Sequence, residues 1–216
     1  MSVMNFSRSL PWLIAAAALA GALGLYLGQR HFAAFSAEAT DTRAALLYPQ
    51  PRVLGDFLLE RSDGTPLTLS DWRDHWSLVF IGFTHCPDVC PQTLALFRDL
   101  EKAWPAEAGP MPSLYFISVD PERDTSKALA DYASYFSPSI VVATAPHERL
   151  EPFTRQLGMI YMKTPLDNGD YTVDHSAHLA VIDPQANLVA LFRPPLQIDA
   201  IIADMRMLQS QNTAAR

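Results

Sequence analysis

LVFIGFTHCPDVCPQTLALFRDLEKAW, residues 78–104, joins two elements that define the class of fold. The continuous apolar run at residues 78–84 predicts a strand that is buried on both faces. Residues 93–104 carry apolar side chains at helical spacing and predict a helix. Both cysteines of the chain, Cys86 and Cys90, lie in the turn between these elements. This unit places the cysteines at the carboxyl end of a strand, where α/β folds carry their functional sites.

The remaining globular sequence alternates strand and helix patterns. Apolar runs predict further strands at residues 114–119, 140–143, 179–182 and 188–192. Helical spacing predicts further helices at residues 126–136, 148–157 and 198–208. Earlier in the chain, Ser62-Asp63-Gly64 signals a hairpin turn between two short apolar runs. The order of elements is that of the thioredoxin core. We therefore predict an α/β fold, a thioredoxin-like mixed sheet flanked by helices, with an N-terminal hairpin addition.

An apolar segment precedes the globular part. Residues 10–27 read LPWLIAAAALAGALGLYL and carry no charge. As a helix they would be about 27 Å long, close to the hydrocarbon thickness of a bilayer. We therefore expect an N-terminal transmembrane helix, a single-pass anchor in the inner membrane. The alternative is a cleaved signal peptide, for which Ala37-Glu38-Ala39 would serve as the cleavage motif.

These patterns divide the chain into five parts. We expect a cytoplasmic N-terminus at residues 1–9, the anchor at 10–27, a tether at 28–50, the globular domain at 51–210 and a tail at 211–216. Both interpretations of the apolar segment export the globular domain to the periplasm.

The charge balance argues against nucleic acid as a partner. The chain has 16 Lys and Arg residues against 23 Asp and Glu residues, which gives a net charge of −7. An acidic protein without a basic stripe repels phosphate backbones. We therefore expect no nucleic-acid partner.

The spacing of Cys86 and Cys90 suits chemistry better than a structural disulfide, because closing so short a loop stabilises a fold little. An i, i+4 spacing puts both sulfurs on one side of a helical turn, and a helix N-terminus favours thiolates. Two adjacent thiolates can form a redox-active disulfide or bind a soft metal such as Cu(I) or Zn(II). Since two sulfurs rarely complete a metal site, a third ligand is expected.

His175 is the strongest candidate for that third ligand. It precedes the strand at residues 179–182, which in a thioredoxin-like sheet runs antiparallel to the cysteine strand. The start of that strand therefore shares a sheet edge with the cysteines. No proline stands where thioredoxins carry a cis-proline, which leaves room for an imidazole. His178 lies deeper along the strand and is expected to be a packed or surface residue, with a spare metal ligand as the alternative. Four histidines lie in segments that do not favour ligation: His31, His75, His85 and His147.

Three motifs resemble those of the Sco/SenC family. They are residues 84–91 (THCPDVCP), 119–125 (VDPERDT) and 169–176 (GDYTVDHS), and the resemblance spans about residues 50–210. That family consists of thioredoxin-like copper-binding domains tethered to the inner membrane. The resemblance implies that copper, as Cu(I) and in a second state as Cu(II), is bound by three ligands: Cys86, Cys90 and His175. It also implies a role in building the binuclear copper centre of cytochrome c oxidase or keeping its thiols reduced, with oxidase subunit II and other copper chaperones as partners.

Asp120 and Asp124 belong to the second of these motifs. Asp120 ends a parallel strand at the edge of the site, where it could orient a ligand or only cap a turn. Asp124 precedes a helix and is expected to act in its cap. Met159 and Met162 are expected to pack in the core or on the surface, although a thioether could also bind copper transiently.

A metallochaperone is the main functional hypothesis, and no catalytic residue is assigned beyond the possible redox pair. A three-coordinate site leaves room for a partner's ligand, so copper could pass by ligand exchange. The alternative is a periplasmic thiol–disulfide oxidoreductase, which needs only Cys86 and Cys90, although their spacing is not Cys-x-x-Cys. A peroxidase is disfavoured because Phe83 stands where peroxiredoxins carry threonine. A copper sensor would need the same ligands and stays open.

Overall fold

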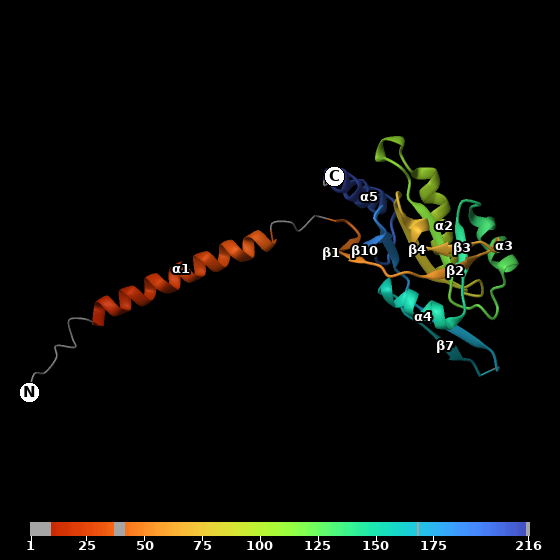
Figure 1. Cartoon of the computed structure of the whole chain (residues 1–216), viewed down its shortest axis with the longest axis horizontal. Coiled ribbons are helices and arrows are strands. Elements are labelled where there is room, and N and C mark those ends of the chain that lie inside the picture. Colours follow the sequence, from red (N-terminus) through yellow and green to blue (C-terminus); the bar gives the residue numbers. More distant parts are fainter. Residues whose placement is uncertain (1–9, 37–41, 168, 215–216) are drawn as a thin grey trace, which may run out of the picture. The chain divides into compact units, whose positions relative to one another are not determined.

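The computed structural model describes residues 10–36, 42–167 and 169–214, and the chain divides into two compact units, Met1–Asp41 and Thr42–Arg216. In the first unit, Leu10–Ser36 forms helix α1 (Figure 1). The predicted helix over residues 10–27 is thus present. The predicted membrane span is not supported, since none of the helices in the described part of the chain is both long and apolar enough to cross a bilayer.

The second unit is built on an eight-stranded mixed sheet (Figure 1). Its strands follow the order β1-β10-β9-β4-β5-β6-β2-β3. They are β1 (Ala45–Val53), β2 (Leu58–Arg61), β3 (Pro66–Thr68), β4 (Ser77–Gly82), β5 (Ser113–Ser118), β6 (Val141–Thr144), β9 (Leu179–Ile182) and β10 (Asn187–Phe192). Strands β4, β5 and β6 run parallel, and β9 pairs antiparallel to β4. The mixed sheet and the antiparallel orientation of β9 confirm the sequence prediction.

Helices cover both faces of this sheet, as predicted. They are α2 (Val89–Ala103), α3 (Ser126–Phe136), α4 (His147–Gln156) and α5 (Ile198–Ala214), with short 3-10 helices at Leu69–Trp72 and Ala106–Ala108. Along β4, Leu78 and Phe80 pack in the core under α2, α3 and α5. Val79 and Ile81 pack in the opposite core, with α4. Because both faces of β4 are buried, its sequence is continuously apolar.

The start and end of the globular unit differ from the prediction. The tether was expected at residues 28–50, but α1 extends to Ser36 and β1 begins at Ala45. Two prolines lie within β1, which restricts it to a sheet edge and obscured its strand pattern in the sequence. The buried carboxylate of Asp204 holds the start of β1, because it accepts hydrogen bonds from three successive backbone N–H groups at residues 43–45. The predicted tail at 211–216 is also shorter, since α5 continues to Ala214.

A separate hairpin carries the late part of the candidate site. Strand β7 (Tyr161–Pro165) pairs antiparallel with β8 (Tyr171–His175), and these two strands form a sheet of their own. The earlier predicted hairpin is present as β2 and β3, which meet around Ser62-Asp63-Gly64 and lie at the sheet edge.

Candidate metal centre

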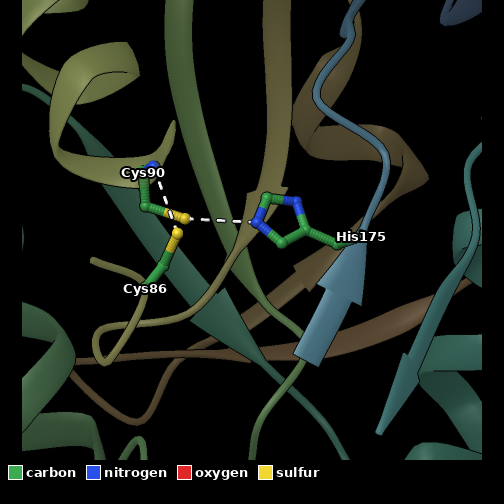
Figure 2. Close-up of side chains that lie close together, drawn as sticks. All are labelled: Cys86, Cys90 and His175. Atoms are coloured by element: carbon green, nitrogen blue, oxygen red, sulfur yellow. Dashed lines mark hydrogen bonds between the residues drawn. The ribbon is translucent and has the colours of Figure 1, made fainter. Parts of the chain in front are cut away.

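The structure brings together the three residues that the sequence singled out. The sulfurs of Cys86 and Cys90 and a ring nitrogen of His175 all lie within 4.8 Å of one another. Figure 2 shows the His175 ring, at the end of β8, pointing toward both sulfurs. The distance from Cys90 Sγ to His175 Nε2 is 3.5 Å, across 85 residues of sequence. Two segments far apart in the chain therefore meet in one site.

The two cysteines differ in environment although they share one turn of chain. Cys86 lies in the loop after β4 and is partly exposed, whereas Cys90 is fully buried in the first turn of α2. The backbone N–H of Cys90 points at Cys86 Sγ over 3.5 Å. Helix α2 begins at Val89, so Pro91 falls in the first turn. A missing N–H costs no intrahelical hydrogen bond there, so Pro91 is compatible with this start of the helix.

Hydrogen bonding makes Cys86 the thiolate of the pair. A hydrogen bond from the Cys90 thiol lowers the pKa of Cys86 far below that of an ordinary thiol; partial burial opposes this, and the backbone N–H groups of Asp88 and Cys90 add to the lowering. The same bond and nearly complete burial raise the pKa of Cys90, so Cys90 keeps its proton. The metal-free site therefore presents one accessible thiolate beside one buried thiol.

The imidazole of His175 is oriented by its neighbours. Its Nδ1 lies 3.1 Å from the carbonyl oxygen of Ser176, so this nitrogen is assigned as the N–H donor. That tautomer leaves the lone pair on Nε2, which faces Cys90 Sγ. The ring also packs edge-to-face between Phe80 and Phe83, with centroids 5.7 and 5.9 Å away. These contacts hold Nε2 toward the sulfurs.

Gly82, Phe80 and Phe83 support the site, a role that the sequence pattern did not reveal. A Cβ on Gly82 would lie 2.4 Å from Cys90 Sγ, so the sulfur occupies the space that a side chain would need. The sequence indicated the role of Gly82 in part, because this glycine interrupts the run of large apolar residues before the cysteines. Which rings would face His175 could not be read from that run, because Phe80 and Phe83 belong to cores on opposite faces of the sheet.

The other histidines with described side chains lie outside the three-residue cluster. His75 bonds to Arg73 and Tyr115, and His147 bonds to Tyr161 and Glu122. His85 is exposed and bonds to the Thr84 hydroxyl. His178 is partly buried, and burial together with Arg193 lowers its pKa.

The two methionines named in the sequence lie in different environments. Met159 is fully buried in the core beside α4, and Met162 is exposed on β7.

Asp120 and Asp124 are both buried, and they act on different parts of the site. The Asp120 carboxylate accepts hydrogen bonds from Arg123 and from the Tyr171 hydroxyl. Within the described residues, none of the hydrogen bonds of this carboxylate goes to Cys86, Cys90 or His175.

The predicted capping role of Asp124 is wrong, because Thr125 is the N-cap of α3 and accepts from the Ala128 N–H. The Asp124 carboxylate instead accepts from the Thr84 N–H and hydroxyl and from the Ser118 hydroxyl. It thereby ties the end of β4 to the end of β5.

The donor set suits a soft, low-coordinate cation. Two sulfurs and one imidazole nitrogen select Cu(I) or Zn(II) over Mg²⁺ or Ca²⁺, which prefer oxygen. The partly exposed side of Cys86 leaves an approach for a ligand from outside. The site can therefore take up a thiophilic metal and exchange it.

Comparisons with known proteins find similar sequences and similar folds. The model of the SCO1/SenC family matches residues 47–210. The mitochondrial protein SCO1 homolog of Homo sapiens is 33% identical over 177 residues, which cover 81% of this chain and 58% of the human protein. The structure resembles that of Arabidopsis thaliana ScoI with copper bound, with a TM-score of 0.68 and 32% identity over 73% of this chain and 98% of that one. It also resembles apo Sco1 of Thermus thermophilus, with a TM-score of 0.69 and 34% identity over 79% of this chain and 99% of that one.

Proposed function

Because the chain belongs to the SCO1/SenC family, we propose that it is a copper metallochaperone whose cargo is held by Cys86, Cys90 and His175. The observation that carries the proposal is the convergence of two sulfurs and one imidazole nitrogen within 4.8 Å. A relative of 32% identity with the same fold holds copper. The recipient we propose is the binuclear copper centre of cytochrome c oxidase subunit II, supplied directly or through other copper chaperones.

Loading follows from the protonation states of the donors. The accessible Cys86 thiolate is the first ligand, because it needs no deprotonation. The Cys90 thiol then loses its proton to solvent, since a metal binds thiolate rather than thiol. His175 completes the set through Nε2, whose orientation is already fixed by the Nδ1–H bond to Ser176. A partner's thiolate can approach on the exposed side of Cys86 and take the ion by ligand exchange.

The redox state of the two cysteines would control this loading. Joining the Cys86 thiolate and the Cys90 thiol in a disulfide releases one proton and passes two electrons to an external oxidant. Both sulfur donors are then lost, so an oxidised chain should not hold Cu(I). Reduction by an external dithiol restores the site.

The experiment that tests the proposal is an anaerobic Cu(I) titration of the reduced chain against a chromogenic Cu(I) chelator. The expected result is one Cu(I) per chain, with affinity lowered at least about tenfold in His175→Ala. The matched control is His178→Ala, which removes an imidazole three residues away and should leave affinity unchanged. The loaded chain should then transfer copper to the soluble domain of an oxidase subunit II. A Cys86→Ala chain that still bound copper stoichiometrically would contradict the assignment.

Thiol–disulfide exchange is a second candidate activity, and the acidic, accessible Cys86 favours it. It requires the two cysteines but not the imidazole. Reductase activity toward a disulfide peptide should therefore survive His175→Ala, whereas copper affinity should not. If the His175→Ala chain lost both reductase activity and copper affinity, thiol–disulfide exchange would be excluded as an independent activity.

We further propose that the globular unit works in the periplasm, with α1 holding it at the inner membrane. The support is the apolar surface of that helix: residues 10–27 are uncharged, and several large apolar side chains are exposed, among them Trp12, Leu13, Ile14, Leu19 and Leu23. Protease added to intact spheroplasts should digest the globular unit. Protection of that unit from protease would contradict a periplasmic location.

A further inference from the structure

The hairpin that carries His175 is held to the domain by side-chain contacts and not by strand pairing with the main sheet. Its two strands pair with each other and form a sheet separate from the main one. Among the described residues of β7 and β8, Val173 alone is buried. Tyr161 and Tyr171 are partly buried and pack against the same core. Besides these apolar contacts and the hydrogen bond of the ring to Ser176, polar contacts at the start of β8 hold the strand that presents His175.

Arg123 supplies several of those contacts, from the loop between β5 and α3. Its Nη1 donates to the carbonyl oxygen of Tyr171 over 2.9 Å and lies 3.3 Å from the carboxylate of Asp170. Its guanidinium also stacks on the Tyr171 ring, with 3.8 Å between the guanidinium carbon and the ring centroid. Tyr171 is the first residue of β8, the strand that ends at His175. Arg123 therefore binds the first residue of the strand that ends at His175.

The same guanidinium also binds a buried carboxylate. Its Nε donates to the buried Asp120 carboxylate over 2.5 Å, and the Tyr171 hydroxyl donates to the other oxygen of Asp120 over 2.7 Å. The guanidinium also faces the ring of Phe83 at 5.7 Å. Phe83 lies against the His175 ring and three residues before Cys86. One side chain therefore connects the cysteine loop to the histidine strand.

We propose that Arg123 is a positioning residue: it holds the strand that ends at His175 so that the imidazole stays close to the two sulfurs. The proposal rests on the metallochaperone function and deepens it. The planar guanidinium binds a carboxylate, a carbonyl oxygen and an aromatic face at once, which a lysine ammonium could not do with the same geometry. An exposed ion pair would contribute little, but only 20% of the Arg123 side chain and none of the Asp120 side chain are exposed. When Arg123 is removed, the imidazole should sample positions out of reach of the metal.

The experiment is a double-mutant cycle on Cu(I) affinity in the full chain. Arg123→Gln is measured in the presence of His175 and in the His175→Ala background, by anaerobic competition with a chromogenic Cu(I) chelator. Arg155→Gln is the matched control, because Arg155 makes an exposed ion pair on α4. We expect Arg123→Gln to lower affinity about tenfold when His175 is present and less than about twofold when it is absent. An equal loss in both backgrounds, or no loss in either, would overturn the proposal.

A second variant keeps the test decisive if Arg123→Gln does not fold, since it leaves Asp120 without its charged partner. Tyr171→Leu removes the platform for the guanidinium but retains the Arg123–Asp120 pair. It should reproduce the same dependence on His175, and an effect independent of His175 would contradict the proposal.

A measurement without metal distinguishes failure of the proposed function from failure of the positioning role of Arg123. Should the unsubstituted chain bind no copper, the metallochaperone proposal fails, and amide hydrogen exchange decides the role of Arg123. Arg123→Gln should then speed exchange at residues 171–176 and leave β4 unchanged. Unchanged exchange at residues 171–176 would overturn the positioning role.

Discussion

At the scale of single residues, the site depends on an asymmetry between two cysteines of the same turn. Cys86 is partly exposed and accepts hydrogen bonds, whereas Cys90 is buried and donates one. The thiolate is the nucleophilic form of cysteine. Because the pKa of Cys86 is lowered, its thiolate persists as pH falls well below the ordinary thiol pKa of about 8.5. Because the pKa of Cys90 is raised, that residue remains a thiol across the same range.

This asymmetry predicts selective alkylation. At pH 6, iodoacetamide should modify Cys86 rapidly and Cys90 slowly in the reduced, metal-free chain, as measured by peptide mass spectrometry over time. Replacing the donor, in Cys90→Ala, should raise the pKa of Cys86 and slow its alkylation at pH 6. Equal rates at the two cysteines, or a Cys86 rate that falls about tenfold per pH unit from pH 8 to pH 6, would show that Cys86 is an ordinary thiol.

Gly82 makes a second prediction at this scale. A methyl group there would meet Cys90 Sγ at 2.4 Å and the Phe116 ring at 2.9 Å, and both are buried. Gly82→Ala should therefore lower the free energy of unfolding by about 1–3 kcal/mol, as overpacked cores do. It should also weaken Cu(I) binding by displacing the sulfur. Urea unfolding and chelator competition measure the two effects.

The control for Gly82 is Gly55→Ala. Gly55 is exposed, and its added methyl group would meet only the end of the flexible Gln156 side chain. Stability and copper affinity should stay near those of the unsubstituted chain. If Gly82→Ala behaved like Gly55→Ala, the close packing of Gly82 against the sulfur would be refuted.

At the scale of elements, a buried carboxylate joins two parallel strands at the edge of the site. Asp124 accepts hydrogen bonds from Thr84, just past the end of β4, and from Ser118, the last residue of β5. Thr84 lies two residues before Cys86. The position of the cysteine loop thus depends on a residue near the start of α3.

Asp124→Asn tests this connection. The amide replaces an acceptor oxygen with an N–H donor that faces other donors, so a buried polar group loses its partner. We expect the free energy of unfolding to fall by about 1–3 kcal/mol, measured by urea unfolding, and the Thr84 amide to exchange faster. Asp131→Asn, on the exposed surface of α3, is the control and should change stability little. If Asp124→Asn were as stable as Asp131→Asn, Asp124 would not have the structural role of joining β4 to β5.

At the scale of the whole molecule, the globular unit begins earlier than its motifs suggest. The start of β1 pairs with β10 through Ala45, Leu46 and Leu47. The carboxylate that holds this strand, Asp204, lies on α5. The first strand of the unit is thereby attached to its last strand and last helix.

Truncation tests this boundary. A chain of residues 42–216 should unfold at the same urea concentration as the globular unit of the full chain. A chain of residues 51–216 keeps the pairing of Arg52 and Val53 with β10 but loses that of Ala45, Leu46 and Leu47. It also leaves Asp204 buried without its three N–H donors, so it should unfold at a lower urea concentration. Circular dichroism during urea titration measures both midpoints. Equal midpoints would show that residues 42–50 are dispensable, as the tether prediction implied.

Local patterns in the sequence were enough for the central strands, the helices and the three candidate ligands. The run at 78–84 is continuously apolar because its strand is buried on both faces, and burial of this kind can be recognised from a short stretch of sequence. The cysteines could be found because they share one helical turn. His175 could be placed because a strand antiparallel to the cysteine strand must begin at the same sheet edge.

Contacts between distant segments were decided by the tertiary structure alone. The hydrogen bond from Arg123 to Tyr171 joins residues 48 positions apart in the sequence, and the hydrogen bond from Ala45 to Asp204 joins residues 159 positions apart. A charged residue in a local window looks the same whether it faces solvent or a buried partner, because its partner lies outside that window. For the same reason the proline-containing β1 could be recognised as a strand only once β10 and Asp204 were in place beside it.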